Sequence, residues 1–173
     1  VAALLDALGI DEAPVLGISG GGPYALACGA VAPTRFPRVA TSCSLGPLAS
    51  GDRSTRLLAG MATRLPWALR LFLAAEVLSA RYAPQWTVER RVKGAAPKDE
   101  PLWRGEVGKL LVASIPAACE AHGTAAFVRD IQLFAGDWGF PLDGITVPVG
   151  VWHGYADRIN PVSMAEYLVD TIP

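Results

Sequence analysis

Residues 15–24 read VLGISGGGPY, and this stretch decides the fold that we predict. The apolar run at 15–18 is typical of a short buried strand, and the glycine-rich turn after it leads into a helical segment. Within the stretch, Gly17-Ile18-Ser19-Gly20-Gly21 has the form G-x-S-x-G. A serine on a sharp turn between a strand and a helix is the usual setting of an activated nucleophile.

The glycines of this turn have separate roles in the prediction. We expect a strained backbone at Ser19, so that Gly17 and Gly21, two residues away on either side, need to lack side chains. The N–H of Gly20, at the start of the helix, is placed to stabilise an oxyanion. A phosphate-binding loop is disfavoured, because no lysine follows the glycines and the spacing G-x-G-x-x-G is absent here. A purely structural glycine turn is the alternative interpretation.

Length and composition indicate a folded chain without a polyanionic partner. The chain has 173 residues, of which 51% are hydrophobic and 18% charged, and its net charge is −1. It is therefore long enough for a hydrophobic core, and its charge gives no general attraction to nucleic acid or to an anionic membrane. No apolar run approaches the length of a membrane span.

The three cysteines, Cys28, Cys43 and Cys119, have neither metal-binding nor redox spacing. We interpret them as reduced thiols, which predicts a cytoplasmic protein. No metal site is visible in the sequence, and the predicted chemistry needs no cofactor.

The order of the predicted elements divides the chain into three parts. Residues 1–47 alternate helix and strand, with strands at 15–18 and 39–45, which favours a parallel sheet. Residues 48–140 contain no convincing strand, and residues 141–173 return to the α/β pattern with a strand at 147–152. The helices predicted for the middle part are 53–65, 67–82, 102–121, which Pro116 interrupts, and 125–135. The last helix, 162–169, follows Asn160-Pro161, interpreted as a cap and a first-turn proline.

This layout resembles the α/β-hydrolase fold. The resemblance is carried by GISGGGPYALA at 17–27 and PVGVWHGYADRINPV at 148–162, with GDWGF at 136–140 as further support. It implies a partial α/β-hydrolase: a parallel sheet of about three strands flanked by helices, with a helical cap inserted at 48–140. Residues 1–47 and 141–173 would then form the core.

The resemblance also implies roles for individual residues. Ser19 matches the nucleophile, Gly20 the oxyanion donor and Asp157 the acid of a catalytic triad. A turn-forming aspartate is the alternative interpretation of Asp157. In the family the histidine base follows the acid, so the resemblance places it after Pro173, and it places the second oxyanion donor before Val1.

Neither histidine of the chain matches the expected base. His153 precedes Asp157, where the family has an H-G pair that packs beside the site, and His122 is interpreted as a residue at a helix end. In the family order the base comes after the acid. We therefore predict that the 173 residues alone are inactive. A sheet of only three strands would leave an edge unpaired and apolar faces exposed, so we also predict that these residues melt without cooperativity.

The function implied by the resemblance is that of a serine hydrolase, which cleaves an ester or related acyl bond through an acyl-enzyme on Ser19. The alternative is a non-catalytic relative that binds a ligand or a partner. We expect a small-molecule acyl substrate. Aromatic residues in the middle part indicate an apolar pocket for its acyl or alcohol group, and the alternative is that they pack the helices together. These residues are Trp67, Phe72, Trp86, Trp103, Phe127 and Phe134.

Overall fold

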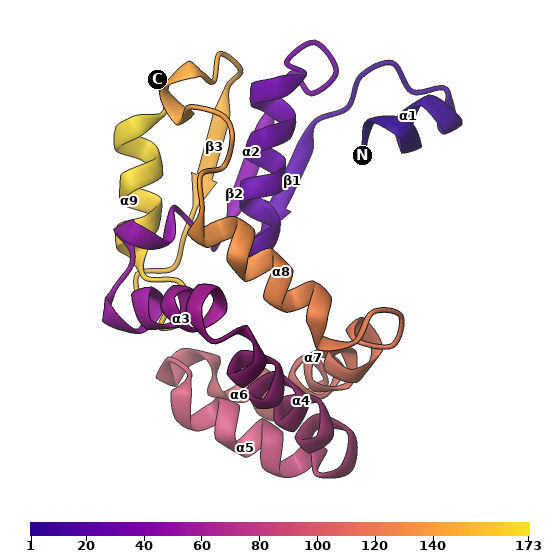
Figure 1. Ribbon diagram of the computed structural model, residues 1–173, viewed down its shortest axis with the longest axis vertical. Helices are drawn as coiled ribbons and strands as arrows, with labels where there is room; N and C mark the ends of the chain where they lie inside the picture. The colour runs from indigo at the N-terminus through magenta and orange to yellow at the C-terminus, as the bar shows by residue number, and fades with distance from the viewer. The chain divides into compact units, whose positions relative to one another are not determined.

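The computed structural model describes residues 1–173, apart from the side chain of Ala49. The chain forms two compact units (Figure 1). The first unit consists of Val1–Arg56 and Leu133–Pro173, and the second consists of Leu57–Gln132. Two helices, α3 (Arg53–Arg64) and α8 (Gly123–Ala135), connect the units along the chain. The assignment of 48–140 to a cap and of 1–47 and 141–173 to the core stays a prediction.

A three-stranded parallel sheet lies at the centre of the first unit, as predicted (Figure 1). Its order is β1 (Val15–Ile18), β2 (Val39–Ser42) and β3 (Val149–Trp152). The three strands end at the same level, because Ile18 pairs with Ser42 and Ser42 pairs with Trp152. Segments that follow the three strands therefore meet at one edge of the sheet.

Helices cover one face of this sheet. α2 (Gly22–Val31) contacts β1 and β2, and α9 (Val162–Thr171) contacts β3. Leu26 of α2 and Leu168 of α9 are fully buried in one cluster with Val39. The remaining elements of this unit are α1 (Ala2–Leu8) and the 3-10 turns η1 (Ser19–Gly21), η2 (Leu48–Ser50) and η4 (Leu142–Gly144).

Apolar side chains of the strands are also left exposed. Leu16 and Ile18 of β1 are 59% and 63% exposed, and Trp152 of β3 is 61% exposed. Parallel sheets are normally covered on both faces, and strands at the edge of a sheet have unpaired backbone groups. Exposed apolar strand residues were expected from the small number of predicted strands.

The second unit is entirely helical in its described residues. Its helices are the main part of α3, α4 (Pro66–Tyr82), α5 (Pro84–Gly94), α6 (Glu100–Arg104), α7 (Glu106–Ala118) and most of α8, with a 3-10 turn η3 (Pro97–Asp99). Leu69 of α4 and Val112 of α7 are its largest fully buried apolar residues. Glu76 of α4 accepts hydrogen bonds from Arg90 and Arg91 of α5, at 2.6 and 3.1 Å.

The predicted helices of this unit need three corrections. The helix α5 was not predicted, because Pro84 resembles a helix breaker although it stands in the first turn, where proline costs little. The single helix predicted at 102–121 is divided into α6 and α7 at Gly105, whose extended ψ of −166° stops α6. Pro116, the predicted interruption, instead lies inside the last turn of α7.

No single described helix is both long and apolar enough to cross a membrane. The bent pairs α3 with α4 and α7 with α8 reach that length and composition only together.

Candidate active site

The backbone at Ser19 is strained, as expected for the turn between β1 and α2. Ser19 has a φ of 53°, and Cys43 is the other described non-glycine residue with a positive φ, at 46°. A left-handed conformation costs an L-residue about 1–2 kcal/mol, so neighbouring bonds must hold it. The Ser19 carbonyl accepts the N–H of Leu45 at 3.2 Å and also the N–H of Gly22.

The steric requirement for glycine differs from the prediction in one position. A Cβ on Gly17 would lie 2.6 Å from the Cα of Gly22, so a side chain there is excluded. A Cβ on Gly21, in contrast, would meet no atom within 4 Å, and the expected crowding at Gly21 is wrong. The crowded position is Gly22, where a Cβ would lie 2.5 Å from the Cβ of Ser44. The reason is that α2 begins at Gly22, and this residue faces the segment after β2.

Gly20 lies between Ser19 and α2, next to an aromatic pair. A Cβ on Gly20 would lie 3.4 Å from the Phe134 ring, which is buried and packs edge-to-face on Tyr24 with 5.6 Å between centroids. Backbone N–H groups at a helix start lack intrahelical partners and can bind an anion. The sequence assigned Phe134 to the inserted middle part, but its contacts with Gly20 and Tyr24 place it beside Ser19.

The turn after β3 brings Asp157 to the same edge of the sheet. Asp157 Oδ1 accepts the N–H groups of Ile159 at 2.8 Å and Asn160 at 3.0 Å. These bonds are the turn-forming contacts that were the alternative interpretation of Asp157. The second oxygen, Oδ2, lies 3.6 Å from Nε2 of His153. One carboxylate oxygen therefore shapes the turn, while the other faces an imidazole.

Asn160 is the residue that links this turn to the serine, and sequence reasoning missed that role. The helix α9 begins at Val162 after Pro161 without a side-chain cap, so the predicted capping by Asn160 is wrong. Its side-chain amide instead donates to the Cys43 carbonyl at 2.7 Å and lies 3.4 Å from Ser19 Oγ. The only sequence signal was a polar residue three positions after Asp157, in a segment that follows a strand.

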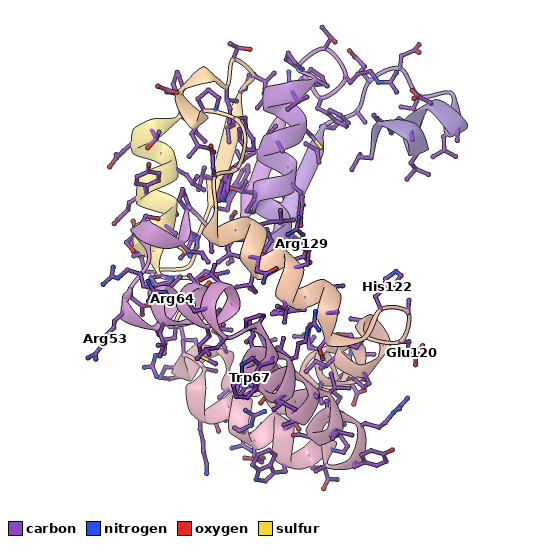
Figure 2. All side chains as sticks on the ribbon, viewed as in Figure 1. Arg53, Arg64, Trp67, Glu120, His122 and Arg129 are labelled. Carbon is purple, nitrogen blue, oxygen red and sulfur yellow. The ribbon has the colours of Figure 1, made fainter. Side chains whose placement is uncertain are left out.

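His153 shares the first unit with Ser19, but its hydrogen bond goes to Asn160 and not to Ser19. His153 Nε2 lies 2.7 Å from the Asn160 carbonyl oxygen, and the side chain is only 4% exposed. Since a carbonyl can only accept, Nε2 carries the proton of that bond. His153 Nδ1 is buried without a partner. His122 is exposed, and its side chain projects from the loop between α7 and α8 (Figure 2).

The second unit contains a cavity of about 860 Å³ among α4, α5, α6 and α7. Its lining includes Ala80, Val88, Val112 and Arg104, but none of the aromatic residues expected to form a pocket. Of those aromatic residues, Phe134 is buried and Trp103 is half-buried. The exposed ones are Trp67, Phe72, Trp86 and Phe127, with exposed fractions from 49% to 63%.

The three cysteines are free thiols, and burial raises the pKa of the Cys28 thiol. Among the described residues, no three His, Cys, Asp or Glu side chains gather as metal ligands would.

Comparisons with known proteins identify the fold. No family model matches the chain, and no curated protein matches it either. Solved structures do match over 99% of the chain. An α/β-hydrolase fold protein from Nakamurella multipartita is 24% identical with a TM-score of 0.54, and a hydrolase from Pseudomonas aeruginosa is 22% identical with a TM-score of 0.58. An enol-lactonase from Burkholderia xenovorans is 18% identical with a TM-score of 0.60.

The chain spans 57%, 58% and 61% of the Pseudomonas, Burkholderia and Nakamurella structures. At these identities the similarity of all three structures to the chain is one of fold. The chain therefore has the α/β-hydrolase fold.

Proposed function

We propose that this chain carries the nucleophile of a serine hydrolase that cleaves an ester or related acyl bond. The observation that carries the proposal is the strained Ser19, with a φ of 53°, directly after β1 and within 3.4 Å of Asn160 in the turn that contains Asp157. A serine held in this conformation projects its hydroxyl from the edge of the sheet. The fold and its hydrolase neighbours support the same assignment.

The reaction follows from the roles assigned to four groups. Ser19 Oγ attacks the substrate carbonyl carbon while a histidine accepts the hydroxyl proton, and the Gly20 N–H donates to the developing oxyanion. Asp157 holds that histidine in the useful tautomer. The proton then passes to the leaving alcohol, and an acyl-enzyme forms on Ser19. Water attacks the acyl carbon in the second half, which releases the acid and restores the serine.

The base of this proposal belongs to the complete protein rather than to either histidine described above. His153 Nε2 is engaged with the Asn160 carbonyl. We therefore infer that His153 is not the base. His122 precedes Asp157 in the chain, against the order nucleophile, acid, base, so we infer that it is not the base either and that these 173 residues by themselves are inactive.

The proposed substrate is a small molecule with an apolar acyl group. Tyr24 is 44% exposed and packs on the buried Phe134 beside Gly20, so its ring offers an apolar surface to a group bound near the oxyanion donor. The enol-lactonase among the structural neighbours acts, as its name states, on a cyclic ester. A net charge of −1 gives no reason to expect a nucleic acid partner. We assign a cap role over the site to the helical residues 48–140, and a cytoplasmic location in line with the free thiols.

A fluorophosphonate probe tests the proposal on the complete protein. We expect stoichiometric labelling of Ser19, hydrolysis of short p-nitrophenyl esters, and loss of both in Ser19→Ala. Ser44→Ala is the matched control, because Ser44 lies beside Gly22 and its hydroxyl donates to the Leu45 carbonyl rather than to Ser19. It should label as the wild type does. A folded protein that neither labels nor hydrolyses any ester would favour a non-catalytic ligand-binding protein.

A further inference from the structure

Asn160 is a buried polar residue whose side chain does not cap the helix α9 that follows it. It is 5% exposed, and its side-chain amide nitrogen donates to the Cys43 carbonyl oxygen at 2.7 Å. A carbonyl oxygen can only accept a hydrogen bond, so the orientation of the amide follows from chemistry: Nδ2 points toward Cys43. The same Nδ2 lies 3.4 Å from Ser19 Oγ. Ser19 Oγ therefore faces a donor and acts as an acceptor in this contact.

The backbone of Asn160 takes part in the same network. Its N–H donates to Asp157 Oδ1 at 3.0 Å, and its carbonyl accepts Nε2–H of His153 at 2.7 Å. One residue thus contacts the proposed nucleophile, the proposed acid and the end of β2. Both side-chain partners, Ser19 and Cys43, have a positive φ. Ser19 directly follows the last residue of β1, and Cys43 directly follows the last residue of β2.

We propose that Asn160 is a positioning residue that sets the hydrogen-bond direction of the nucleophile. This inference rests on the proposed role of Ser19. Because Asn160 donates to one lone pair of Oγ, the hydroxyl proton of Ser19 is directed away from Asn160 and stays available to the base. When that proton moves to the base, Asn160 keeps both of its own amide protons and donates to an oxygen that now carries negative charge.

The length of the contact agrees with this role. At 3.4 Å it is longer than the 2.7–3.2 Å of ordinary N–H···O bonds. Hydrogen bonds at reacting atoms are often long in a free enzyme and shorten when charge develops. A donor that strengthens only as Oγ becomes negative lowers the barrier rather than stabilising the resting serine.

The test measures phosphonylation of Ser19 in the complete protein as a function of pH. Asn160→Leu removes the donor at nearly constant volume. We expect its plateau rate constant to fall about 10- to 100-fold, as for loss of one hydrogen bond to a charged group. The apparent pKa of the profile, which reports the base, should stay at the wild-type value. Asn160→Asp keeps the shape but places an anion beside Oγ, and its labelling should be at least as slow.

Ser163→Ala is the matched control, because its hydroxyl joins α9 to the Ser50 carbonyl at 3.3 Å without touching Ser19. It should label at the wild-type rate. Wild-type rates in both Asn160 variants would overturn the inference. So would a rate loss with a displaced apparent pKa, since that pattern means that Asp157 has moved. Absence of labelling in the wild-type protein would instead refute the proposed function, so the two failures are distinguishable.

Discussion

The imidazole of His153 is turned toward Asp157, with Nε2 3.6 Å from Oδ2, while the same nitrogen lies 2.7 Å from the Asn160 carbonyl. This geometry gives His153 a structural part in the turn. We predict that His153→Ala destabilises the protein by about 1–3 kcal/mol, because it removes a buried hydrogen bond and leaves the Asn160 carbonyl unpaired. Chemical denaturation of the complete protein measures the loss.

The control for His153 is His153→Gln, whose amide nitrogen can replace Nε2. It should recover much of the stability, and fluorophosphonate labelling of Ser19 should persist in it. A His153→Gln protein that is fully folded but does not label would contradict the structural role and point to His153 as the base.

Two glycines of the serine turn form a second matched pair. Gly17→Ala would place a Cβ 2.6 Å from Gly22 Cα, and we expect a loss of about 3 kcal/mol or more together with loss of Ser19 labelling. Gly21→Ala meets open space at a φ of −76°, so its free energy of unfolding should be unchanged or slightly higher. Urea titrations of both variants decide this. Equal destabilisation by the two substitutions would contradict the observed crowding.

The start of α3 predicts a dependence of stability on pH. Hydrogen bonds from Ser54 and Thr55 hold the pKa of Asp52 at about 2. Because this pKa lies below the ordinary value, the stabilisation is complete above pH 4 and is lost as the pH falls toward 2. In the complete protein, the difference in melting temperature between wild type and Asp52→Asn should therefore shrink from pH 5 to pH 2. Asp11→Asn, which removes an exposed charge elsewhere in the chain, is the matched control.

The ion pair between Glu76 and Arg90 is half-buried, and we predict that it contributes more to stability than an exposed pair does. The hydrogen bond from Arg90 lowers the pKa of Glu76, which Arg91 also contacts. Glu76→Gln should cost about 1 kcal/mol after solvent screening, and the cost should vanish as the pH falls below the ordinary range of a glutamate. Glu106→Gln, which breaks an exposed pair with Lys109, should show no measurable change in thermal unfolding. Equal losses in both would contradict the assignment.

The sequence predicted those parts of the molecule that depend on local pattern. The apolar run predicts the strand 15–18, and the glycine turn predicts the strained Ser19. The alternation of helices and strands predicts a parallel sheet. The prediction of Gly21 as the crowded glycine was wrong, because crowding depends on which residue faces Ser44 after folding. The helix α5 was missed because a proline at a helix start has the same local signature as one that ends a helix.

Asn160 shows why the rest of the site could not be predicted from sequence. Its two side-chain partners, Ser19 and Cys43, lie 141 and 117 residues away along the chain. No periodicity or spacing in the neighbourhood of Asn160 indicates such partners. In the sequence, an asparagine that caps a helix cannot be distinguished from one that bridges two strand ends, since a proline follows in both cases. The difference is seen only in the folded sheet, where the strand ends lie close together.

The left-handed backbone at Ser19 limits which nucleophilic side chains are compatible with this position. A thiol has the same unbranched connection to the backbone, so cysteine fits where serine stands. Threonine does not, because a β-branched side chain is strongly disfavoured at a φ near 53°. Attempts to re-engineer the chemistry at position 19 therefore have a choice of reacting atom, oxygen or sulfur, but not of side-chain branching.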